Sequence, residues 1–231
     1  MYTGKTIKTL FMPLFLALCF SASVHSADAV TVTVTAADKS NNRAAGFKFS
    51  KKSSTDQTVA GISAQPIVHY QQNIHMLSAV NDRPTFQVFG DGRVLVHYPV
   101  YMKMAGDYEM QLDEVELIDL LHSLSDNGVM DFDSDKHKAG KETEKQSLKA
   151  KGQYFAISDA VETIIEIRLD EYQKNNSTKT ISNFYKKFKW ENLEHDAKRF
   201  KKLKALEQSN ASVSELKRMM KDPRLTKRDQ P

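Results

Sequence analysis

Apolar and polar residues alternate most regularly between Pro84 and Phe132, and this stretch predicts a folded core. Thr85–Phe89 and Val94–Tyr98 both have the period-two pattern of a β-strand. Asp91-Gly92, between them, is a two-residue turn sequence of the kind that closes a β-hairpin. Such a turn would place Val88 opposite Leu95 and would leave apolar side chains on both faces of the sheet.

The alternation continues beyond Pro99. Val100, Met102 and Met104 keep the period-two spacing, and Tyr108, Met110 and Leu112 repeat it after a Gly106-Asp107 turn. We therefore expect a meander of three antiparallel strands.

An amphipathic helix should follow the meander. Asp113 can cap its start, and Glu116 is placed to complete a capping box. Asn127-Gly128 supplies a left-handed stop, after which Val129 can fold back on the last turn. The apolar stripe that faces the sheet would be Leu117, Leu120, Leu121 and Leu124.

Two further regions of strand pattern flank this unit. Ile67–Leu77 contains strand-forming residues without clean alternation, and Val161–Tyr172 alternates clearly. Asn175-Asn176-Ser177 is a turn sequence, after which Thr180–Phe184 can return as a hairpin partner. Residues 133–153 between the two regions indicate a charged, lysine-rich connection.

The end of the chain predicts two helices. Apolar residues recur at helical spacing from Trp190 to Leu203, and a capping box at Ser212–Glu215 would open a shorter helix. The expected fold class is therefore α+β: an antiparallel sheet of about five strands with one helix packed on a face. This domain would span residues 66–185, and a basic helical C-terminal region would span residues 186–231.

The first 26 residues have the layout of a secretory signal peptide. Lys5 and Lys8 precede an apolar run, Leu10–Phe20, and small residues follow it. Cleavage would fall after Ser26 or Ala29, and an uncleaved membrane anchor is the alternative. We therefore expect a periplasmic or secreted protein, in which residues 27–65 form a flexible linker that includes an alternating stretch, 30–35.

Charge and cysteine content narrow the classes of function. The single cysteine, Cys19, lies in the expected signal peptide, so a mature chain has neither a thiol nucleophile nor a cysteine-ligated metal. The formal net charge is +4. The segment from Lys186 to the end of the sequence contains 14 Lys and Arg residues and 7 Asp and Glu residues. The charge is thus concentrated in the C-terminal region, beyond a mildly acidic body.

The hairpin, the strand after it and the capped helix resemble an uncharacterised domain of secreted and envelope bacterial proteins. The resemblance covers roughly residues 84–133 and is carried by Phe86–Phe89, Asp91–Val94 and Leu112–Leu117. Some members have paired cysteines before the hairpin, which this chain lacks. The shared pattern is structural, so the resemblance supplies no active-site residues.

One segment has the acidic spacing of a calcium loop. Residues Asp131, Asp133, Asp135 and Glu142 occupy loop positions 1, 3, 5 and 12 of an EF-hand. Lys136 stands where the motif needs glycine, and further lysines would repel a cation. A solvated acidic turn is therefore the favoured interpretation of Asp131–Glu142.

Three weaker patterns also point to chemistry. The residues Met102, Met104, His75, Met76 and His97 are soft ligands suited to copper(I), although alternating methionine is more typical of core packing. Ser214-Glu-Leu-Lys217 fits a Ser-x-x-Lys pattern, but it falls in a surface helix. Glu162 and Glu166 form a carboxylate pair on the expected solvent face of a strand.

The segment Glu191–Leu206 predicts a basic amphipathic helix that could meet an acidic partner or a membrane surface. A helix packed on the sheet with lysines facing solvent is the favoured alternative. The sequence contains no nucleic-acid-binding motif, no phosphate-binding glycine loop, no Gly-x-Ser-x-Gly and no His-Glu-x-x-His. We therefore expect a secreted or periplasmic non-catalytic binding module of unknown partner, with no assigned catalytic, cofactor or metal residues. The alternative is a small hydrolase or metal-dependent enzyme with an unrecognised site.

Overall fold

The computed structural model describes residues 45–51, 65–74, 82–153, 157 and 159–228. The expected signal peptide, the alternating stretch at 30–35 and most of the expected linker lie outside these residues. Within them the chain forms an antiparallel sheet with helices, which confirms the α+β class. The sheet contains eight described strands and is larger than the five that the sequence predicts.

The strands run in the order β1-β6-β2-β3-β4-β5-β8, and β7 pairs with β6 outside this path. Every pairing is antiparallel, and the longest is the β6–β7 hairpin. The strand bounds are β1 Gly46–Lys48, β2 Val68–Ile74, β3 Thr85–Val88, β4 Arg93–Tyr98, β5 Gly106–Gln111, β6 Val161–Gln173, β7 Thr180–Glu191 and β8 Thr226–Lys227.

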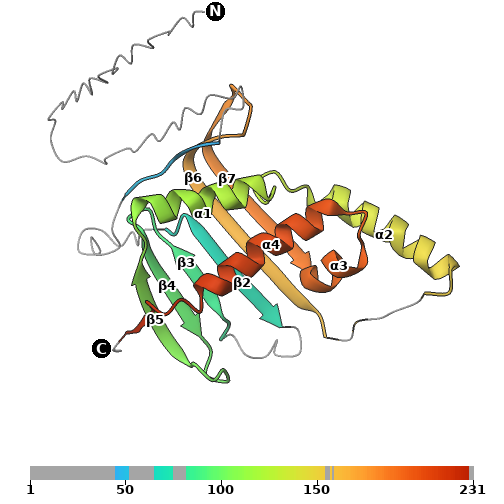
Figure 1. Cartoon of the computed structure of the whole chain (residues 1–231), viewed down its shortest axis with the longest axis horizontal. Coiled ribbons are helices and arrows are strands. Elements are labelled where there is room, and N and C mark those ends of the chain that lie inside the picture. The colour runs from blue at the N-terminus through green and yellow to red at the C-terminus, as the bar shows by residue number, and fades with distance from the viewer. Residues whose placement is uncertain (1–44, 52–64, 75–81, 154–156, 158, 229–231) are drawn as a thin grey trace, which may run out of the picture.

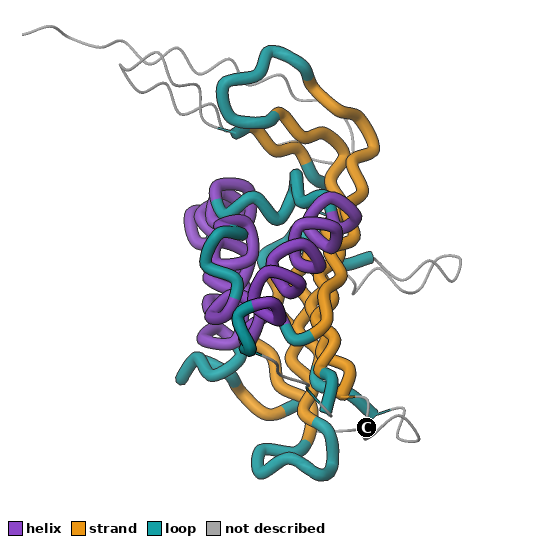
Figure 2. The backbone as a smooth tube through the Cα atoms, turned by 90° about the vertical axis from the view of Figure 1, so that its right-hand side faces the viewer, coloured by secondary structure: helices purple, strands orange, loops and turns teal. Residues whose placement is uncertain are grey.

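The described helices are α1 Glu114–Asp126, α2 Ser134–Ala150, α3 Leu193–Arg199 and α4 Lys204–Met219. They lie on one side of the sheet, where α4 crosses the strands (Figures 1 and 2). Within the described residues no helix covers the other sheet face (Figure 2), and in such a two-layer arrangement inward positions are apolar and outward positions are polar. The strand burial follows this rule: Phe86, Val94 and Ile165 are buried, whereas Gln87 and Glu166 are only partly so.

The β3–β4 hairpin confirms the expected strands but corrects their register. Val88 pairs with Val94, not with Leu95, because the loop holds three residues and not two. Gly92 adopts φ +84°, and the Phe89 N–H donates to the Arg93 carbonyl at 2.9 Å. This is a turn followed by a left-handed residue, a geometry that glycine adopts without strain.

The pattern at Val100, Met102 and Met104 does not form a strand. Pro99 ends β4, and two consecutive turns connect it to β5, with the Met102 N–H donating to the Pro99 carbonyl at 2.9 Å. The alternating apolar residues are therefore exposed in a loop. The expected three-stranded meander is nevertheless present and consists of β3, β4 and β5.

Helix α1 matches its sequence signals. The Asp113 side chain accepts the Glu116 N–H at 2.8 Å, and the Glu116 side chain accepts the Asp113 N–H at 3.0 Å. At the other end, Gly128 has φ +72° and the Val129 N–H donates to the Leu124 carbonyl at 3.0 Å. The four predicted leucines are all buried against the sheet.

Part of the expected linker belongs to the core. Residues 45–49 place Ala45, Phe47 and Phe49 in buried positions, and β1 pairs with the end of β6. The Phe47 ring stacks on Tyr172, with centroids 6.0 Å apart, and meets His122 edge-on at 5.0 Å. The short apolar sequence therefore docks as an edge strand despite its polar surroundings.

The C-terminal region is also built into the domain. Strand β7 continues to Glu191, so the expected boundary at 185/186 falls inside a strand and Trp190 is not helical. Helix α4 begins at Lys204, which makes Ser212 a buried interior residue and not a cap. The apolar residues of α3 and α4 belong to the same hydrophobic cluster as the sheet and α1.

Candidate ligand-binding pocket

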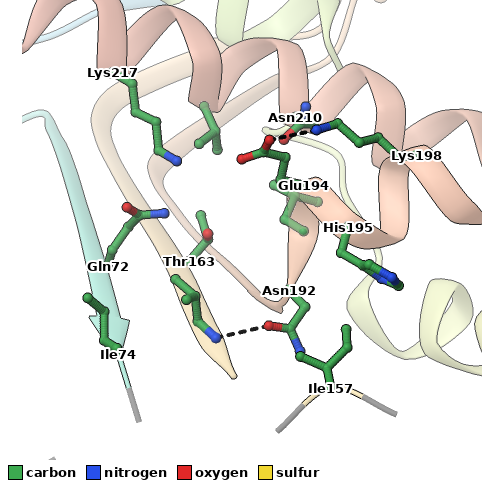
Figure 3. A pocket seen from close by; sticks show the side chains of 13 residues that line it. Gln72, Ile74, Ile157, Thr163, Asn192, Glu194, His195, Lys198, Asn210 and Lys217 are labelled. Carbon is green, nitrogen blue, oxygen red and sulfur yellow. Dashed lines mark hydrogen bonds and ion pairs between the residues drawn. The ribbon is translucent and has the colours of Figure 1, made fainter. Parts of the chain in front are cut away.

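A pocket of about 460 Å³ lies where one end of β2 and β6 meets α3 and α4. Its size is within the range of small-molecule sites. Strand side chains form one wall, and α4 contributes Asn210, Val213 and Lys217 from the opposite side (Figure 3).

The chain creates this space by reversing sharply after β7. Asn192 adopts the left-handed conformation, with φ +58°, and its side-chain oxygen accepts the Val161 N–H of the neighbouring strand at 3.0 Å. Helix α3 then runs for only seven residues before the chain turns into α4. The start of α3 thus lies beside the end of β6, and Leu193, Glu194 and Lys198 line the pocket there.

The inner surface is mainly apolar. Ile74 and Val161 come from the strands, Leu193 comes from α3, and Val213 comes from α4. Leu193 and Val213 are buried and also belong to the hydrophobic core, so this surface is rigidly supported. Polar groups on Gln72, Thr163 and Asn210 interrupt it; Thr163 lies close to Gln72 in the view of Figure 3.

Three charged residues stand on the helix side of the pocket. Glu194 and Lys198 form an ion pair of 2.8 Å within α3. The hydrogen bond and charge of Lys198, reinforced by the charge of Lys217, hold the pKa of Glu194 below its usual range. Among the described residues no carboxylate lies within ion-pair distance of Lys217. Lys217 therefore supplies the excess positive charge of the pocket.

Two titratable side chains of the pocket, Glu194 and His195, have partners of their own. Glu194 is held as a carboxylate by its lysine partner, which makes it a poor proton donor at neutral pH. His195 lines the pocket too, but its Nδ1 lies 3.5 Å from the Asp196 carboxylate, and Figure 3 shows the ring apart from Lys217. No serine or cysteine occurs among the described residues that line the pocket.

The acidic residues of Asp131–Glu142 do not surround a common point. Residues from Ser134 onward form α2, whose start is capped by Asp133 through the N–H groups of Asp135 and Lys136. Asp131 pairs instead with Lys174 at 3.0 Å. A helix carries Glu142 about 12 Å along its axis from Ser134, so the segment cannot wrap one cation. In the described residues no cluster of three or more His, Cys, Asp or Glu could hold a metal ion.

The soft ligands are similarly dispersed. Met102 and Met104 are exposed in the β4–β5 turn, and His97 is bound by two carboxylates. His75 and Met76 lie outside the described residues. The geometry described gives no basis for copper binding.

The remaining candidates have structural partners. The Ser214 hydroxyl donates to the Asn210 carbonyl one turn earlier at 2.8 Å, so it is not arranged with Lys217 as a nucleophile. Glu162 binds Lys189 at 2.7 Å, and Glu166 binds Lys187 at 3.0 Å, across the β6–β7 pairing. These carboxylates form cross-strand ion pairs on the sheet face opposite the described helices.

The basic segment Glu191–Leu206 is not one helix. It comprises the end of β7, the whole of α3, a turn and the first residues of α4. Of its basic residues, Lys198 reaches the pocket. Sequence patterns did not predict the pocket, because its residues come from four elements. One local signal was present: Asn192 directly follows a long strand, and asparagine at such a position is typical of a turn.

None of the helices in the described part of the chain is long and apolar enough to cross a membrane. Comparison of the chain with family models, with curated proteins and with solved structures found no match.

Proposed function

We propose that this protein is a secreted or periplasmic non-catalytic binding module, and that its pocket takes a small amphiphile with an anionic head group. The observation that carries the proposal is the position of Lys217 above an apolar surface. An apolar tail fits against Leu193 and Val213, and a carboxylate or phosphate oxygen fits beside the Lys217 ammonium.

The charges of the pocket support an anion in preference to a cation. Lys198 neutralises Glu194, so Lys217 decides the local balance. The side-chain amides of Gln72 and Asn210 and the hydroxyl of Thr163 can donate further hydrogen bonds to the head group. The predicted signal peptide supports export to a compartment bordered by membranes, where such ligands occur.

The enzyme alternative has less support. A hydrolase needs a nucleophile or an activated water beside a base, and the described residues of the pocket supply one paired glutamate and one histidine on the same short helix. A binding role uses the apolar surface, the polar groups on the strands and α4, and the charge of Lys217.

Calorimetric titration with decanoate and decan-1-ol tests the proposal. We expect one decanoate per chain, bound more tightly than the alcohol. Lys217→Gln should weaken decanoate binding about tenfold and leave decan-1-ol binding unchanged, because only the charged hydrogen bond is lost. Lys221→Gln is the matched control, since Lys221 is an exposed lysine just beyond α4.

Absence of saturable decanoate binding would overturn the proposal. So would equal decanoate affinities for the Lys217→Gln and Lys221→Gln variants, because the recognition of the anion would then lie elsewhere.

A further inference from the structure

The turn between β4 and β5, residues Pro99–Ala105, carries a concentrated apolar surface that we term the β4–β5 tip. Eight large hydrophobic residues are exposed in the described part of the chain, and four of them lie within five consecutive positions of this turn. The exposed fractions are 82% for Val100, 43% for Tyr101, 37% for Met102 and 46% for Met104. Such a cluster marks a contact surface, whereas single exposed apolar residues are ordinary.

The backbone holds the tip in a defined shape. The Ala105 N–H donates to the Met102 carbonyl at 3.1 Å, which closes the second of the two turns. Asp82 fixes the base of the tip, because its carboxylate accepts the Val100 N–H at 3.1 Å and its carbonyl accepts the Tyr101 hydroxyl at 3.4 Å. A constrained turn loses little conformational entropy when its side chains are buried by a partner.

Two lysines accompany these apolar side chains. Lys103 lies in the middle of the tip, and no carboxylate among the described residues pairs with it. Lys227 of β8 lies at the base of the tip, where its Nζ would be 3.5 Å from a Cβ placed on Gly106. The nearby carboxylates of Asp82 and Asp107 both bind His97, at 2.5 and 2.6 Å.

An apolar turn flanked by cations matches the chemistry of a lipid surface. Apolar side chains enter the boundary between head groups and acyl chains, tyrosine favours the head-group layer, and lysine attracts anionic lipids. We propose that the β4–β5 tip docks on an anionic bilayer, with Val100, Met102 and Met104 inserted and with Lys103 and Lys227 against the head groups.

The tip and the pocket lie at the same end of the sheet. One row of paired residues crosses the strands from Gln71 of β2 through Thr85 and His97 to Asp107. Gln72, the next residue of β2, lines the pocket, and the next residues of β4 lead into the tip. A docked molecule would therefore hold the pocket end of its sheet near the bilayer, although docking itself does not depend on a ligand.

An environment-sensitive NBD fluorophore at position 102 tests the docking. The label is attached to Met102→Cys in a Cys19→Ser background, since Cys19 is the only native cysteine. Val115→Cys is the matched control, because Val115 is 67% exposed on α1 and not on the tip. With vesicles of 30% phosphatidylglycerol in phosphatidylcholine, the label at 102 should shift to the blue and brighten, and the label at 115 should change little.

Charge and apolar contributions are then separated by substitution. Lys103→Gln and Lys227→Gln should each weaken vesicle binding about fivefold at low salt, since a lysine near an anionic surface contributes that much. Val100→Ser with Met104→Ser should weaken binding at least about tenfold.

The docking proposal is overturned if the label at 102 shifts no more than the label at 115. It is also overturned if neutral vesicles bind as well as anionic ones, or if none of these substitutions changes the affinity. Because the Lys217→Gln variant leaves the tip unchanged, loss of decanoate binding and loss of docking can be distinguished.

Discussion

A buried carboxylate connects three elements of the C-terminal half, and its removal should lower the free energy of unfolding. The Asp196 side chain of α3 is 1% exposed, and it accepts the Trp190 indole N–H of β7 at 2.8 Å. The same oxygen pairs with Lys141 of α2 at 2.6 Å. Helix α2 has no buried residues of its own, so this ion pair is a principal attachment of α2 to the body.

The structure sets the size of the effect. Asp196→Ala leaves a buried indole N–H without its acceptor, which costs about 1–3 kcal/mol, and leaves Lys141 without its counter-ion. Because the Lys141 side chain is 28% exposed, its ammonium can turn toward water. We therefore expect a loss of about 3 kcal/mol in the free energy of unfolding, at the lower end of the range for a broken buried pair.

Urea titration followed by tryptophan fluorescence measures this loss, since Trp190 is the only tryptophan. Circular dichroism of the helices gives a second probe of the same transition. Lys204→Met is the control, because it breaks an exposed pair with Glu207 and should cost less than about 1 kcal/mol.

A double substitution tests the electrostatic reasoning further. Lys141→Met leaves a buried charge, whereas Lys141→Met combined with Asp196→Asn removes the charge and keeps an acceptor for Trp190. The double variant should therefore be more stable than Lys141→Met alone. A cost for Asp196→Ala no larger than that of Lys204→Met, or a double variant less stable than the single one, would refute the account.

Two further predictions concern the sheet. Burial alone would lower the pKa of His97, but its ring nitrogens bind the Asp107 and Asp82 carboxylates, and these hydrogen bonds outweigh burial and raise the pKa above its ordinary value. The stability from this contact is fully present below about pH 6.5, and it is lost as the pH rises through the raised pKa of the folded state. The urea midpoint should therefore fall less between about pH 6 and about pH 8.5 in the His97→Gln variant than in the unchanged protein. An equal fall in the two proteins would contradict this reasoning. Phe47→Ala should cost about 3–5 kcal/mol in the same titration, whereas its neighbour Lys48→Ala should cost less than about 1 kcal/mol; equal costs would show that β1 is not part of the core.

Sequence signals within a few residues of one another correctly predicted those elements that are stabilised by contacts between near neighbours in the chain. The capping box of α1, its leucine stripe and its glycine stop are each readable within a few residues, and all are present in the structure. The β3–β4 strands were predicted too, but their register depends on whether the loop has two or three residues, which the sequence Gly-Asp-Gly leaves open.

The elements that sequence patterns missed depend on distant contacts. Helix α2 has no apolar stripe to identify it, and one ion pair of its residue Lys141 with Asp196 helps to hold it. Trp190 fits both a strand that alternates with lysines and a helical repeat, and pairing with Thr163 of β6 decides for the strand. The pocket could not be predicted because Gln72, Val161 and Lys217 become neighbours only after the sheet and α4 have assembled.

The most direct test of the pocket is a measurement of nuclear Overhauser contacts between bound decanoate and the side chains of the protein. We expect contacts from the acyl chain to Leu193 and Val213, and from the carbon next to the carboxylate to the side chain of Lys217. Contacts confined to other residues, or none under conditions in which decanoate is bound, would contradict it.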